Sequence, residues 1–202
     1  MINWTIRRSI ANGAALLMAL CGVSVSSSSA SDAPRVRNQE YRFSVEFPVG
    51  VRICTAISGE QPHGFFVRLN ANQSECVSAD KTSIVSVISV SAYSNATFKK
   101  SPEAEIAGLC RQSSADDEID AMKGLSFVGR RSARCQVQHP DGSIDIYVVT
   151  QAGQWPGAHE SQELNAPYIN YTASLHTTQS RMSEDLKVLR KVLNSVHIGY
   201  PK

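Results

Sequence analysis

Apolar and polar residues alternate along much of the chain, a pattern typical of β-strands with one buried face. In segment 41–47 the aromatic residues and the valine all fall on one side, and Pro48 ends the segment. Strands are predicted at 41–47, 51–54, 64–69, 83–93, 132–138, 144–148 and 168–177, with a short terminal strand at 197–198. Residues 139–142, His-Pro-Asp-Gly, predict a tight turn and therefore a hairpin. Residues 31–39 are expected to be a polar leader.

Two segments have helical signals instead. Ser101, Pro102 and Glu103 begin a predicted helix, because serine caps it, proline suits the first turn and glutamate complements the dipole. Apolar residues recur at helical spacing over 182–195, which predicts a second helix. The sequence therefore predicts an α+β domain, in which a single antiparallel-rich sheet packs with two helices.

The first thirty residues have the features of a secretory signal peptide. Arg7 and Arg8 precede an apolar stretch from 14 to 23, and Ser28 and Ala30 are small residues before a cut at Ser31. The apolar stretch is about half of the roughly 20 residues that span a bilayer, which disfavours an anchor. A lipid-attachment site at Cys21 and a twin-arginine signal at Arg7 and Arg8 fit this segment less well. Residues 31–202 are expected to form one exported domain.

Four cysteines remain in the mature chain, and exported proteins commonly pair such residues. Three pairings are open, and we favour Cys54–Cys76 with Cys110–Cys135 because sequential pairs close short loops. Zinc ligation is disfavoured, since the chain has no C-x-x-C pair. We therefore expect two disulfides, no metal site and no cofactor.

Charge and motifs exclude some classes of function. The chain has 20 basic and 18 acidic residues, and loss of Arg7 and Arg8 leaves the mature chain with 18 of each. This balance argues against nucleic-acid binding, and no later segment is long enough to span a membrane. No nucleophile elbow, zinc-protease motif or nucleotide-binding loop occurs, so no catalytic residue is expected. His139 is expected to hydrogen-bond locally, and His176 to be solvated.

Two loops are candidates for partner binding. Residues 61–66 place adjacent aromatic residues after a proline and glycine loop, and residues 153–160 carry a tryptophan in a long segment without periodicity. The candidate binding residues are His63, Phe65, Phe66, Trp155 and His159.

Both ends of the mature chain resemble Mog1/PsbP-like domains. The resemblance rests on the opening strand into proline, 41–48, and on the closing helix into a short strand, 189–196. It implies an α/β/α sandwich and a non-catalytic binding role. Exported bacterial members of that group include lipoproteins and periplasmic immunity proteins for secreted toxins.

Three functional hypotheses follow. The leading one is a periplasmic protein that neutralises a partner protein, such as a secreted toxin or hydrolase, by occlusion. The second is a small-ligand or envelope-accessory module with a pocket between the sheet and the helices. The third is a secreted hydrolase that uses His63 or His159.

Overall fold

A computed structural model describes residues 33–58, 61–69, 76, 86–94, 101–110, 122–153 and 168–199. The chain divides into two units, Met1–Asp32 and Ala33–Lys202, and every described residue lies in the second. The predicted signal peptide therefore lies outside the described residues. Within the described part, nine strands and two helices form the α+β architecture that the sequence predicts.

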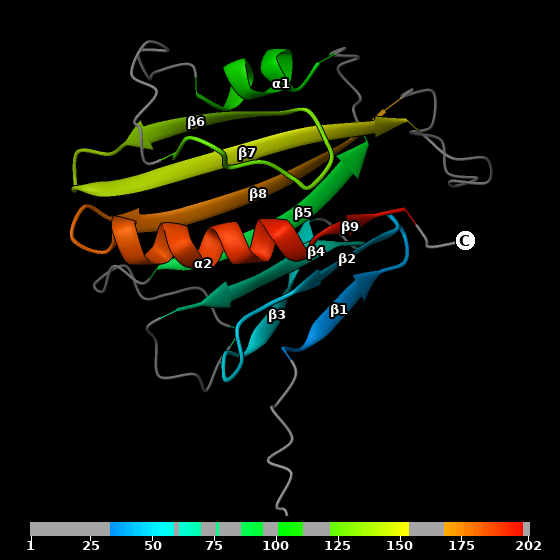
Figure 1. The fold of residues 1–202 in the computed structure, drawn as a ribbon, viewed down its shortest axis with the longest axis horizontal. Coiled ribbons are helices and arrows are strands. Elements are labelled where there is room, and N and C mark those ends of the chain that lie inside the picture. Colours follow the sequence, from blue (N-terminus) through cyan, green and yellow to red (C-terminus); the bar gives the residue numbers. More distant parts are fainter. Residues whose placement is uncertain are drawn as a thin grey trace, which may run out of the picture. The chain divides into compact units, whose positions relative to one another are not determined.

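The larger sheet has six strands in the order β3-β4-β5-β8-β7-β6, and all neighbours are antiparallel (Figure 1). Its strands are β3 (Ile53–Ser58), β4 (Gln61–Arg68), β5 (Val87–Ser94), β6 (Ser132–Gln138), β7 (Ser143–Gly153) and β8 (Tyr168–Thr178). The predicted hairpin is present as β6 and β7. Its turn has Gly142 at φ 82°, and the His139 N–H donates to Ser143 O at 2.9 Å. The prediction of antiparallel pairing is thus confirmed.

A separate small sheet contains β1 (Arg35–Asn38), β2 (Phe43–Glu46) and β9 (His197–Ile198), in the order β1-β2-β9. The prediction of one single sheet is therefore wrong. The cause is a long-range contact, because the chain leaves the last helix and pairs at once with β2. There Phe43 lies opposite Ile198.

Residues 35–38 form β1, although the sequence predicts a polar leader there. Val36 is the one apolar residue of this four-residue strand, so no alternation is visible in the sequence. The strand exists because it pairs with β2 over its whole length. Arg35 and Glu46 lie opposite each other in this pairing, and Arg35 Nε donates to Glu46 Oε1 at 2.9 Å.

Both predicted helices are confirmed. In α1 (Pro102–Leu109), the Ser101 side chain accepts a hydrogen bond from the Ala104 N–H at 3.1 Å, as expected for a capping serine. The second helix, α2 (Met182–Ser195), has the predicted bounds and lies along the larger sheet in Figure 1. Neither helix of the described residues is long and apolar enough to cross a bilayer.

The two helices cover opposite faces of the larger sheet. Val148 and Val149 are neighbours on β7, so their side chains point to opposite faces. Val148 belongs to the main core with Leu189 of α2. Val149 belongs to a smaller cluster with Ile106 of α1. We call the side of the sheet under α1 the α1 face.

The start of α2 is joined to the larger sheet by a buried carboxylate. Asp185 is 1% exposed and accepts hydrogen bonds from Ser86 Oγ at 2.5 Å and Thr177 Oγ1 at 2.6 Å. Arg181 Nη2 donates to its other oxygen at 3.3 Å. A buried charge needs such partners, so this network fixes where the helix begins on the sheet.

Two disulfides link Cys54 to Cys76 and Cys110 to Cys135, which is the favoured pairing. Their Cα atoms are 5.6 and 6.4 Å apart, within the normal range for disulfides. Cys110 directly follows α1 and Cys135 lies on β6, so the second bond ties the helix to the α1 face. Disulfides form in oxidising compartments, so they indicate an exported environment.

Candidate functional site

A continuous row of paired residues crosses all strands of the larger sheet. Its members, in register from β3 to β6, are Cys54, Phe66, Ser89, Ser174, Tyr147 and Cys135. Directly paired side chains point to the same face, and Tyr147 and Cys135 pack on the cluster of α1. The whole row therefore lies on the α1 face. We call it the cross-strand row.

The cross-strand row is partly exposed between its two ends. Phe66, Ser89, Ser174 and Tyr147 are each half-buried. The hydroxyl oxygens of Ser89 and Ser174 are 2.7 Å apart and share a hydrogen bond. Each end of the row is a disulfide-bonded cysteine. The row thus holds two aromatic side chains and two hydrogen-bonded serines on paired strands. A disulfide lies at each end.

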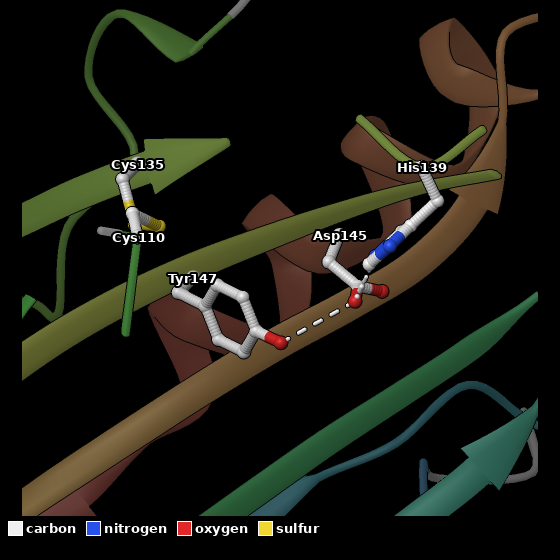
Figure 2. Close-up of a disulfide and its surroundings, with 5 residues drawn as sticks. All are labelled: Cys110, Cys135, His139, Asp145 and Tyr147. Carbon is white, nitrogen blue, oxygen red and sulfur yellow. Dashed lines mark hydrogen bonds and ion pairs between the residues drawn. A yellow bond between two sulfur atoms is a disulfide. The ribbon is translucent and has the colours of Figure 1, made fainter. Parts of the chain in front are cut away.

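An Asp–His cluster lies beside the row on the same face. The Asp145 carboxylate contacts two imidazoles, with Oδ1 2.7 Å from His176 Nδ1 and Oδ2 2.7 Å from His139 Nε2. The Tyr147 hydroxyl donates to Asp145 Oδ2 at 3.3 Å. Figure 2 shows the side chains of His139 and Tyr147 both directed toward the Asp145 carboxylate. The histidine side chains are 38% and 40% exposed, so solvent or a partner can reach them.

Strand register and one turn assemble this cluster. Asp145 and His176 are direct partners across β7 and β8, so their side chains share a face. The hairpin turn brings His139 back over Asp145. Asp141 in that turn accepts hydrogen bonds from the Ser143 side chain and N–H at 2.6 and 2.9 Å. These bonds from Ser143 lower the pKa of the Asp141 carboxyl, and the two histidines lower it further.

A second polar group lies between α1 and the same face. The Tyr93 hydroxyl donates to Glu105 Oε1 at 2.8 Å, and Glu105 is 7% exposed. Burial raises the pKa of Tyr93 to about 12, and the Glu105 carboxylate adds to this effect. Asn170 and Thr172 lie close by, and these two polar side chains partly offset the rise in the pKa of Tyr93. Polar contacts therefore anchor α1 on the sheet in addition to apolar packing.

The Asp–His cluster can hydrogen-bond to a binding partner. A carboxylate that holds a histidine nitrogen also occurs in general-base catalysis. Among the described residues, however, neither histidine is hydrogen-bonded to a serine, threonine or cysteine side chain. The same part of the chain holds no group of three metal-ligating residues placed around one ion. Recognition by a carboxylate, two imidazoles and a phenol is the chemistry that these contacts support.

The sequence pattern alone does not connect His139 with His176. His139 does bond locally through its N–H, but its ring also reaches Asp145. The side chain of His176 is 40% exposed, in line with its expected outward position, and its ring also contacts Asp145. Asp145 and His176 occupy outward positions on adjacent predicted strands, which is the signal that could have found them. The missing information was the register between the strands.

The predicted binding residues separate onto different faces. The His63 ring lies 5.5 Å from the Tyr41 ring, and its Nδ1 is 3.3 Å from Ala92 O. Phe65 packs on the main core and meets Phe43 edge to face at 6.0 Å. Phe66 alone of these three belongs to the cross-strand row. The other two candidates, Trp155 and His159, lie outside the described residues.

Residues 61–66 are part of strand β4, so the strand predicted from residue 64 is confirmed, and the loop expected at 61–63 is instead the start of that strand. Gly64 suggested a loop, yet it marks a close approach between two strands. A Cβ at this position would lie 2.1 Å from Val90 O on β5. Glycine inside a strand often has this role. The strand pairing therefore turns adjacent aromatic residues to opposite faces, and only one remains available on the α1 face.

Comparison with known proteins assigns no family. No protein-family model matches the chain, and no curated protein matches it. Function is therefore inferred below from the residues and contacts of the chain itself.

Proposed function

We propose that residues 31–202 are an exported, periplasmic protein that binds a partner protein and neutralises it by occlusion, in the manner of an immunity protein. The cross-strand row carries this proposal. It presents Phe66 and Tyr147 with the linked serines between them, and a disulfide holds each end. Aromatic residues dominate the energetics of protein interfaces, so these two side chains are the expected anchors.

Preorganisation supports a binding role for this face. Binding costs free energy when side chains and loops must be ordered, and that cost is smaller on a paired sheet. The row lies on six hydrogen-bonded strands, so its side chains are already positioned. The adjacent carboxylate and imidazoles supply directional contacts, which contribute to specificity more than to raw affinity. The partner would therefore present hydrogen-bond donors to Asp145 and apolar surface to the aromatic anchors.

Sequence features support the location and the type of partner. The signal-peptide pattern of residues 1–30 and the two disulfides favour export. The resemblance of segments 41–48 and 189–196 to Mog1/PsbP-like domains favours an immunity-type role and an α/β/α sandwich. Helices on opposite faces of the larger sheet agree with that sandwich. A secreted toxin or hydrolase is the proposed target.

The decisive experiment has two stages. Tagged, oxidised residues 31–202 are used to capture partners from envelope extract, and the captured protein is then purified separately. One molar equivalent of the chain is expected to inhibit the activity of that purified partner. A partner whose activity is unchanged by saturating amounts of the chain would overturn the occlusion mechanism.

Variants locate the interface. Phe66→Ala and Tyr147→Ala should each weaken binding by more than about 1 kcal/mol, roughly fivefold or more in Kd. Val128→Ser is the matched control, because Val128 is a 58% exposed apolar residue that lines a cavity with Asn194 and Val196 at the end of α2. Circular dichroism checks that each variant is folded at the assay temperature. Unchanged affinity in both aromatic variants would remove the cross-strand row from the proposal.

A further inference from the structure

The small sheet carries a basic row on its outer side. Arg37, Ser44 and His197 are direct partners across β1, β2 and β9. Their neighbours Val36 and Phe43 point the other way, into the main core. A cavity of about 410 Å³ opens at this side of the small sheet. This feature is separate from the α1 face, so it is independent of the function proposed above.

The cavity has an excess of positive charge. Its described lining includes Arg35, Arg37, Arg42 and His197, and it includes no acidic residue. Arg35 is paired with Glu46. Arg37 is exposed, and no hydrogen bond or ion pair joins its side chain to another described residue. Arg37 therefore places an exposed guanidinium in the lining of the cavity.

Arg42 has an unusual backbone conformation at the rim of this cavity. Its φ is 47°, in the left-handed region that glycine and asparagine favour. Its carbonyl accepts a hydrogen bond from the Gly199 N–H at 2.7 Å, which ties the turn between β1 and β2 to the end of β9. A strained residue that persists in a folded protein often has a functional role. Here the strained residue is one of the cavity's arginines.

The lining defines the chemistry of the ligand. Arginine has a planar set of donors that matches the oxygens of a carboxylate or phosphate group. Phe43 and Ile198 also border the cavity, and its volume is typical of sites for small organic molecules. We propose that this cavity binds a small organic oxyanion, a molecule with a phosphate or carboxylate group on an organic body.

Four probes test this proposal with folded, oxidised residues 31–202. Phenyl phosphate and benzoate each carry a charged oxygen group and an organic ring. Inorganic phosphate carries only the charge, and phenol carries only the ring. Saturable binding of phenyl phosphate or benzoate is expected, with amide NMR shifts centred on Ser44 and His197. Comparison of these two probes distinguishes a phosphate from a carboxylate as the preferred group. No saturation by either probe up to about 10 mM, beyond the range of ordinary weak ligands, would overturn the proposal.

Three variants connect the binding to the arginines. Arg37→Gln removes the exposed guanidinium, and Arg42→Asn keeps a residue that tolerates a positive φ. Each should weaken binding about tenfold or more, as expected for the loss of a charge-assisted partner. The control is Arg131→Gln, because Arg131 is a 77% exposed arginine that pairs with Glu103 beside α1. Equal weakening by the control, or none by the two site variants, would contradict the assignment. Equal affinity for inorganic phosphate alone would contradict an organic ligand.

Discussion

Asp145 on β7 lies directly opposite His176 on β8, and its Oδ1 is 2.7 Å from His176 Nδ1. The second carboxylate oxygen is equally close to His139, which comes from the turn before β7. One side chain thus joins two strands and a turn. The contact follows from cross-strand pairing, because residues directly opposite in an antiparallel pair point to the same face.

Loss of this carboxylate should destabilise the hairpin. Asp145→Ala removes the contacts to both histidines, and we expect the free energy of unfolding to fall by about 1–2 kcal/mol. Tyr147→Phe is the matched control, since it removes only a 3.3 Å contact to the same carboxylate. Urea unfolding measures the free energy of unfolding of both variants. A smaller loss in Asp145→Ala than in Tyr147→Phe would show that the histidine contacts add no stability.

Reduction or replacement of either disulfide should lower the free energy of unfolding, and the two bonds should have similar effects. The bonds join residues 22 and 25 positions apart. Loop-closure entropy then predicts about 3 kcal/mol for each bond. The Cys54→Ser/Cys76→Ser and Cys110→Ser/Cys135→Ser double variants are compared by denaturant unfolding. Peptide mapping without reductant should yield these two linked pairs, and any other linkage would contradict the structure.

Gly64 should tolerate no side chain. Gly64→Ala places a Cβ 2.1 Å from Val90 O, so β4 and β5 must move apart. The expected loss of stability is about 1–3 kcal/mol, as for overpacked cores. Gly153→Ala is the control, because a Cβ there meets nothing within 4 Å. Thermal unfolding should show a large drop in Tm for the first variant only, and equal effects would argue against the close approach.

Tyr93 should ionise late in the folded protein. Burial first, and then Glu105, raise its pKa from 10.0 to about 12. Because the raised pKa belongs to the folded state, this contribution to stability is complete below pH 10 and is lost as pH rises toward about 12. Absorbance at alkaline pH follows tyrosinate formation. Tyr93→Phe should remove the absorbance change of one tyrosine that ionises near pH 12.

A second variant separates the two causes of this shift. Glu105→Gln removes the carboxylate charge but leaves Tyr93 buried against α1. The pKa of Tyr93 should therefore fall only part of the way toward 10.0, because desolvation is the larger cause. A titration of Tyr93 that is unchanged in Glu105→Gln would contradict the hydrogen bond between the two side chains.

The sequence by itself determined the local elements. Helix α2 has the predicted bounds 182–195, because apolar residues recur at helical spacing and acidic residues open the first turn. The start of α1 follows from the Ser-Pro-Glu signal at Ser101. The hairpin follows from the turn at 139–142, and short loop lengths favoured the cysteine pairing that the structure has. Each of these features depends on residues that are close in the chain.

Only the tertiary structure decided which distant residues meet. Strand β1 is too short and polar to be visible in the sequence, and β2 joins β9 across nearly the whole domain. The cross-strand row and the contact of Asp145 with His176 both require the register of paired strands. Alternation shows which side chains share a face of one strand, but it does not show which residue lies opposite on the next. For that reason the fold class was predictable from the sequence, and the candidate sites were not.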